Sequence, residues 1–178
     1  MKFRKLPNSF AGMLLLGVLT GFVVLYAGSI TDILLFKTVL LLISMVLVFF
    51  SLHPLAHYAT GLAFHVRTRY FFLSRSDFRK LGGSLGRLGN AIPTIGVKFD
   101  SERLKMTSRS RRAFLFGVGA IASNVGMLVI LLISVALDFG LVSSTIGTLF
   151  FLASLGTELL FSTKVGDLNK MRRARSLP

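Results

Sequence analysis

The chain lacks cysteine and tryptophan altogether and has only seven acidic residues among its 178. Without cysteine it can form neither a disulfide nor a thiolate metal site, so a metal ion would need histidine, carboxylate or carbonyl ligands. Charged residues make up 16% of the chain, against about 25% in soluble domains. By contrast, 53% of the residues are hydrophobic and the mean hydropathy is +0.73. These proportions indicate an integral membrane protein.

Positive charge is abundant but confined to three blocks. The net charge is +14, and the basic residues lie near the N-terminus, in segment 66–112 and after Thr163. Lys37 is the one basic residue between these blocks. Charge segregated in this way sets membrane topology and attracts anionic lipid headgroups. We therefore predict contact with a lipid bilayer and no nucleic-acid partner.

Long apolar runs predict an all-α polytopic protein that forms a single membrane domain over residues 1–178. About four transmembrane helices account for the pattern, over residues 10–27, 33–52, 113–136 and 141–162. The second is expected to continue as a site helix to about residue 65, with Pro54 kinking or restarting it. A basic loop, 66–112, holds a short strand or membrane-dipping hairpin within 82–99, and a basic tail covers 163–178. The positive-inside rule places both termini and the basic loop in the cytoplasm.

A histidine pair, His53 and His57, lies where the second apolar run ends. Residues at i and i+4 are about 40° apart around a helix, so both imidazoles can reach one metal ion. Alternatively, both rings hydrogen-bond to neighbouring helices at the membrane interface. Asp167 follows the fourth span on the same side and would complete a His₂Asp site, with a position left open as in catalytic zinc sites. Alone, Asp167 is equally typical of a turn after Gly166.

These motifs and their order resemble the site-2 protease family of intramembrane zinc metalloproteases. His53-Pro54-Leu55-Ala56-His57 resembles that family's His-Glu-x-x-His, and Gly166-Asp167 resembles its later aspartate motif. The third span, with Gly119 to Asn124, is similar to the family's glycine- and asparagine-bearing helix, which lines the site. The resemblance implies that His53, His57 and Asp167 bind zinc. It also implies that segment 82–99 receives a transmembrane client.

Pro54 stands where that family has the glutamate that acts as general base. Loss of a general base typically lowers a rate by about 10²–10⁴. The resemblance therefore predicts a non-proteolytic relative that binds metal and a client or partner subunit. Replacements for the base are conceivable from Glu158, Asp77 or Glu102, while His65 would instead add a ligand. Glu158 precedes Asp167 by nine residues, which would put the two on opposite faces of one continuous helix.

Three alternatives stay open from the sequence. The chain could be an active intramembrane zinc protease that uses a different base, such as Glu158. It could be a metal-free structural subunit of a membrane complex, in which case His53 and His57 are packing residues. It could also be a small transporter or insertase, although the few charges inside its spans argue against ion-coupled transport.

Overall fold

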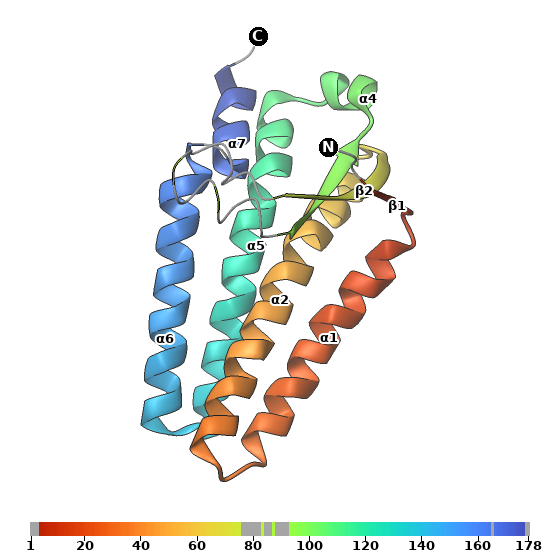
Figure 1. Cartoon of the computed structure of the whole chain (residues 1–178). Coiled ribbons are helices and arrows are strands. Elements are labelled where there is room, and N and C mark those ends of the chain that lie inside the picture. Colours follow the sequence, from red (N-terminus) through yellow and green to blue (C-terminus); the bar gives the residue numbers. More distant parts are fainter. Residues whose placement is uncertain (1–3, 76–82, 84–86, 88–92, 165, 177–178) are drawn as a thin grey trace.

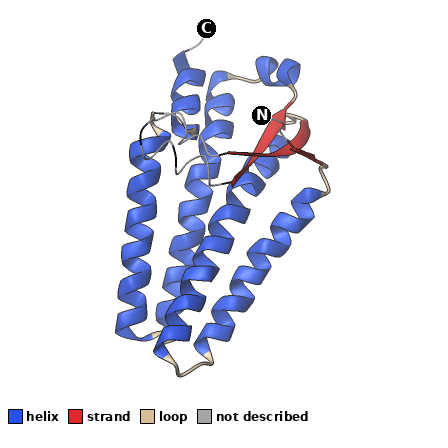
Figure 2. Cartoon of the chain, in the orientation of Figure 1, coloured by secondary structure: helices blue, strands red, loops and turns tan. Residues whose placement is uncertain are grey.

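Four long helices form a bundle in the computed structural model, which describes residues 4–75, 83, 87, 93–164 and 166–176 (Figure 1). The helices are α1 (Phe10–Ser29), α2 (Leu34–Ala63), α5 (Arg109–Ala136) and α6 (Gly140–Thr157). A short π-helix, η2 (Glu158–Ser162), extends α6. A three-stranded sheet, a short helix α4 (Ser101–Met106) and a final helix α7 (Asp167–Ser176) lie at one end of the bundle (Figure 2).

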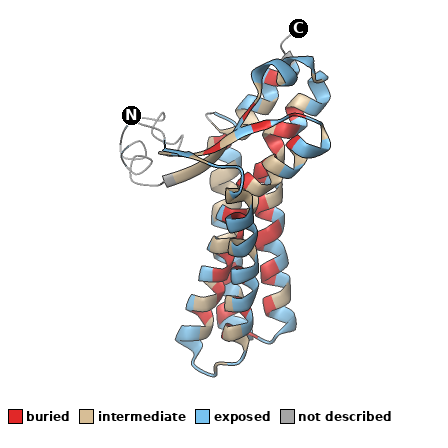
Figure 3. Ribbon diagram, turned by 90° about the vertical axis from the view of Figure 1, so that its right-hand side faces the viewer, coloured by how far each residue is buried: buried red, intermediate tan, exposed pale blue. Residues whose placement is uncertain are grey.

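In the part of the chain that the structure describes, four helices are long and apolar enough to cross a membrane. They are Phe10–Ser29, Leu34–Ala63, Arg109–Ala136 and Gly140–Ser162. Large apolar side chains stay exposed on their outer faces, among them Leu16, Val23 and Leu132 (Figure 3). Apolar surface on this scale is typical of proteins whose solvent is lipid. The prediction of four helices long and apolar enough to span a membrane is confirmed.

The bundle core forms where α2 packs between α1 and α5. Its fully buried side chains come from these helices and from the α5–α6 turn: Leu25, Leu41, Met45, Val48, Met127, Ile130 and Phe139. Small residues let the helices approach closely. A Cβ atom on Gly21 would lie 2.6 Å from Val48 Cγ2, and one on Gly126 would lie 2.7 Å from a Leu52 methyl group. Close packing therefore fixes the position of α2, which carries both histidines.

The antiparallel sheet has the order β1-β2-β3, with β1 (Arg4–Leu6), β2 (Thr68–Arg75) and β3 (Pro93–Phe99). The strand expected near residues 92–99 is present, and Pro93 begins an edge strand, where its missing N–H is tolerated. Sequence patterns did not identify β1 or β2. Phe71 of β2 is completely buried and contacts the rings of Phe10 and Tyr58. Most of the glycine-rich stretch 82–91 lies outside the described residues.

The structure adds two facts about helix continuity. Of the two effects expected of Pro54, a restart of the helix is excluded, because α2 runs through Pro54 from Leu34 to Ala63. The basic tail contains a helix that the sequence analysis did not predict, because α7 begins at Asp167 and packs along α5. Met171 contacts Gly117, and Ala174 is buried. This packing holds the start of α7 near the histidines.

Candidate metal centre

Three side chains from α2 and α7, which are far apart in the sequence, lie close together. They lie at the end of the bundle that is predicted to face the cytoplasm. The Nε2 atoms of His53 and His57 lie 2.8 and 3.0 Å from the same oxygen, Asp167 Oδ2. The ligand atoms of all three residues lie within 4.8 Å of one another, so the group could hold a metal ion. His57 is buried, while His53 and Asp167 keep about a fifth and an eighth of their side-chain surface exposed. The structure thus brings together all three residues that the sequence nominated as ligands.

Helix α5 orients both imidazoles through their other ring nitrogen. His57 Nδ1 lies 2.7 Å from the carbonyl oxygen of Leu115. A carbonyl only accepts, so Nδ1 carries the proton and donates it. His53 Nδ1 lies 3.4 Å from Ser123 Oγ, and that hydroxyl donates its own proton to the Gly119 carbonyl at 2.8 Å. Both rings therefore direct Nε2 toward Asp167, to which each donates a hydrogen bond. A metal ion bound there would replace the two Nε2 protons, and outer hydrogen bonds at Nδ1 orient metal-binding histidines in the same way.

Gly119 keeps the space beside the two Nε2 atoms open. A Cβ atom built there would collide with His57 Nε2 and would lie 2.9 Å from His53 Nε2. A side chain at this position would therefore occupy volume next to the atoms that would bind a metal. The lack of a side chain on Gly119 is a requirement of the site as well as of helix packing.

Asp167 is held as an anion with one oxygen directed at the histidines. Lys170, one turn further along α7, donates to Asp167 Oδ1 at 2.8 Å, which leaves Oδ2 for His53 and His57. Burial by itself would raise the pKa of the Asp167 carboxyl. The hydrogen bonds from His53 and His57 and the charges of His57 and Lys170 outweigh that effect, so the pKa lies well below its usual range. An ionised carboxylate is the form that binds a metal.

The donor set and its spacing suit a zinc ion. Zinc lies about 2.0–2.2 Å from nitrogen and oxygen ligands, which puts tetrahedral neighbours about 3.4 Å apart. The two Nε2–Oδ2 separations, 2.8 and 3.0 Å, are close to that value, and all three ligand atoms lie within 4.8 Å of one another. Two histidines and one carboxylate leave the fourth tetrahedral position free for a non-protein ligand.

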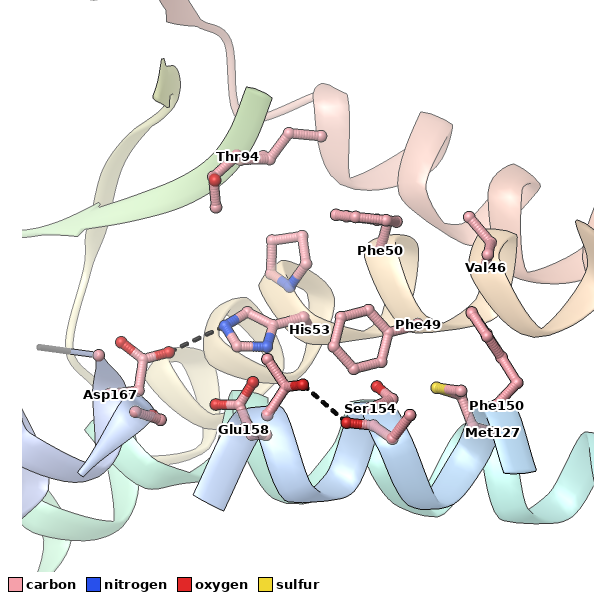
Figure 4. A pocket seen from close by; sticks show the side chains of 16 residues that line it. Val46, Phe49, Phe50, His53, Thr94, Met127, Phe150, Ser154, Glu158 and Asp167 are labelled. Atoms are coloured by element: carbon pink, nitrogen blue, oxygen red, sulfur yellow. Dashed lines mark hydrogen bonds and ion pairs between the residues drawn. The ribbon is translucent and has the colours of Figure 1, made fainter. Parts of the chain in front are cut away.

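Pockets reach these residues from two sides. One, of about 440 Å³, extends from Val46 and Phe150 in the bundle to His53, Glu158 and Asp167 (Figure 4). Most of its wall is apolar, and Thr94 and Ile95 of β3 close one side. The other, of about 130 Å³, lies under the sheet and touches His53, His57, Asp167 and Lys170. His53 and Asp167 therefore line both pockets, while His57 lines only the smaller one, whose wall has the larger share of polar surface.

Glu158 lines the larger pocket together with His53 and Asp167. Figure 4 shows its side chain directed from the end of α6 toward the part of the pocket where these two residues lie. The expectation that Glu158 faces away from Asp167 assumed one regular helix. Instead, the π-helical turn of η2 begins at Glu158 and ends at Ser162, and a new helix, α7, begins at Asp167. Glu158 is outside the close group of three ligand atoms, so it lies in the pocket without being a ligand there.

The remaining nominated residues lie elsewhere or cannot be placed. His65 is exposed at the end of α2, with a positive φ of 56°. Glu102 forms an exposed ion pair with Lys105 at 3.4 Å, and Asp77 lies outside the described residues. Pro54 lines the larger pocket next to His53. The resemblance placed the segment with Ser123 beside the site but gave Ser123 no contact, and sequence reasoning missed the Leu115 carbonyl and Lys170. Of the two missed groups, only Lys170 has a sequence signal, since it lies one helical turn after an acid.

Comparison with known proteins adds no assignment: the chain matches no family model, no curated protein and no solved structure.

Proposed function

We propose that this chain is a site-2-protease-like integral membrane protein that binds zinc through His53, His57 and Asp167. The observation that carries the proposal is the convergence of both Nε2 atoms on one partly buried carboxylate oxygen, with α5 fixing the ring orientations. The residues fit the metal because Gly119 leaves room beside the nitrogens. Bound zinc would supply a Lewis acid with one open position.

The pocket beside the centre supports a role in holding a client polypeptide. Its apolar wall, which includes Phe49, Phe50 and Phe150, suits the side chains of a transmembrane segment. The edge strand β3 borders the same pocket through Thr94 and Ile95. In this proposal the client's apolar part lies between α2 and α6, and its backbone approaches the metal centre.

Pro54 favours a client-binding, regulatory or scaffold role without cleavage, because it cannot accept a proton where the related enzymes use glutamate. The pocket-facing position of Glu158 favours a second candidate function, hydrolysis with a base from a different helix. Both candidates share the metal centre. Both also share the proposed orientation, with the termini and the sheet on the cytoplasmic side, next to anionic headgroups.

Thermal unfolding in detergent tests the metal centre against a metal-free structural role. Zinc added to chelator-treated protein should raise the unfolding midpoint, because a ligand that binds the folded state alone stabilises it by about 2.7 kcal/mol at 100 times its Kd. The Asp167→Asn variant should lose this rise, since the amide is a much weaker ligand. An equal rise in both proteins would contradict the assignment, and no rise in either would favour the structural subunit.

A further inference from the structure

Glu158 is a carboxylate without an ion-pair partner among the described residues, at the level where the helices leave the apolar bundle. It is half-buried and lines the larger pocket with His53 and Asp167. An ionisable side chain at membrane depth is costly and usually serves a function. A purely structural carboxylate would be expected to pair with a base, as Glu102 does with Lys105.

The other acidic residues that the structure describes are elsewhere. Asp32 and Asp138 lie in the turns at the far end of the bundle (Figure 1). Asp100 caps α4 by accepting from the Glu102 and Arg103 N–H groups, and it also pairs with Arg69. Asp167 is already occupied by His53, His57 and Lys170. Glu158 is thus the one described carboxylate that lines the pocket and is not committed to another group.

The local backbone explains how Glu158 reaches this position. An α-helix continued from α6 would turn residues 158 and 167 to different faces. The π-helical turn of η2 interrupts this regular geometry from Glu158 onward, and π-helical turns occur frequently at functional sites. Ser162, at the end of η2, is buried, and its hydroxyl accepts from the Leu168 N–H at 3.1 Å. This contact couples the start of α7 to the turn that carries Glu158.

We propose that Glu158, directly after α6, is the proton acceptor of this site. It would perform the role that Pro54 of α2 cannot perform. The inference rests on the proposed metal centre and extends its second candidate function to the cleavage of an amide bond. A water O–H bond breaks as its oxygen bonds to the carbonyl carbon of the client, and the proton moves to the Glu158 carboxylate. Glu158 then gives this proton to the amide nitrogen as the C–N bond breaks, which yields a carboxyl group and an amine.

Acetohydroxamic acid is a suitable probe because it must release a proton when it binds zinc through both oxygens. A carboxylate beside the metal can take that proton and hold it in a charge-assisted hydrogen bond. Calorimetry on the zinc-loaded protein in detergent measures this binding without a client or turnover. The variants are Glu158→Gln, the same change with Pro54→Glu, and the exposed control Glu102→Gln. Zinc content is measured for each.

We expect Glu158→Gln to keep one zinc per chain and to bind acetohydroxamic acid about 10- to 100-fold more weakly, the range for loss of a hydrogen bond to a charged group. Glu102→Gln should bind as wild type does, and Pro54→Glu should restore binding to Glu158→Gln. Unchanged binding by Glu158→Gln would overturn the proposal, as would no binding by the zinc-loaded wild type. Zinc loss in Glu158→Gln would also overturn it, because Glu158 would then be a ligand. If wild type held no zinc, the metal centre itself would fail.

Discussion

At the scale of single residues, the candidate centre depends on contacts that hold each side chain in its orientation. His57 is fixed by a backbone carbonyl of α5, and Asp167 is fixed by Lys170 within α7. Each of these two candidate ligands is therefore oriented by a contact on the side away from the position that a metal would take. Such outer contacts typically contribute about 10- to 100-fold to metal affinity.

Gly119→Ala tests whether the space beside the Nε2 atoms is required. The new methyl group would collide with the ring of His57, so zinc affinity should fall by at least about 100-fold, more than loss of an outer contact usually costs. Zinc titration against a competing chelator measures the change. Gly156→Ala is the matched control, because a Cβ atom there meets nothing within 4 Å. Equal losses in the two variants would point to a general effect of alanine on the bundle.

The three residues of the candidate centre could be named from the sequence, but their supporting contacts could not. The i, i+4 spacing of His53 and His57 predicts that both rings lie on one face of a helix, and the order of the motifs indicated Asp167. The Leu115 carbonyl has no sequence signature, because every residue has one. The contacts of Gly119 and Ser123 with the histidines depend on how α2 and α5 cross, which only the packed structure shows.

At the scale of elements, the connection from α6 to α7 determines where the acidic groups of the site lie. The sequence predicts a helix to about residue 162, followed by a turn and a basic tail. Helical periodicity then places Glu158 and Asp167 on opposite faces. A π-helical turn has no clear sequence signal, and the polar sequence of α7 gives little sign of the packing against Gly117 that stabilises it.

Ser162→Ala tests whether the start of α7 controls the metal centre. The change removes the acceptor of the Leu168 N–H, and such a lost cap costs about 1 kcal/mol. Because α7 carries Asp167, we expect zinc affinity to fall by about fivefold, measured by the same chelator competition. Thr163→Val is the control, since that exposed hydroxyl donates only to carbonyls of its own turn. If both variants bind zinc as wild type does, α7 holds its position independently of Ser162.

At the scale of the whole molecule, the charge distribution and the fold agree on one polarity. The sheet, α4 and α7 gather at one end of the bundle, and the α1–α2 and α5–α6 turns lie at the other (Figure 1). The basic residues that the structure describes are concentrated at the first end, with Lys37 at the other, where its ammonium donates to the Asp138 carbonyl at 3.1 Å. The candidate metal centre lies near the basic end, which the proposed orientation places on the cytoplasmic side.

Single-cysteine labelling tests this orientation directly, because the chain has no cysteine of its own. The variant Asp32→Cys probes the α1–α2 turn, and Arg103→Cys probes exposed α4. In intact cells, a membrane-impermeant thiol reagent should label Asp32→Cys and should label Arg103→Cys only after the membrane is opened. The opposite pattern would reverse the orientation, and labelling of both in intact cells would contradict a four-span topology.

Elemental mass spectrometry of the detergent-purified protein tests the central claim most directly. Wild type and the His53→Ala/His57→Ala double variant are compared, with His65→Asn as a control that keeps a residue tolerant of positive φ at the end of α2. We predict about one zinc per chain in wild type and His65→Asn, and none above background in the double variant. Equal metal in wild type and the double variant, or none in any of the three, would contradict a metal centre at His53, His57 and Asp167.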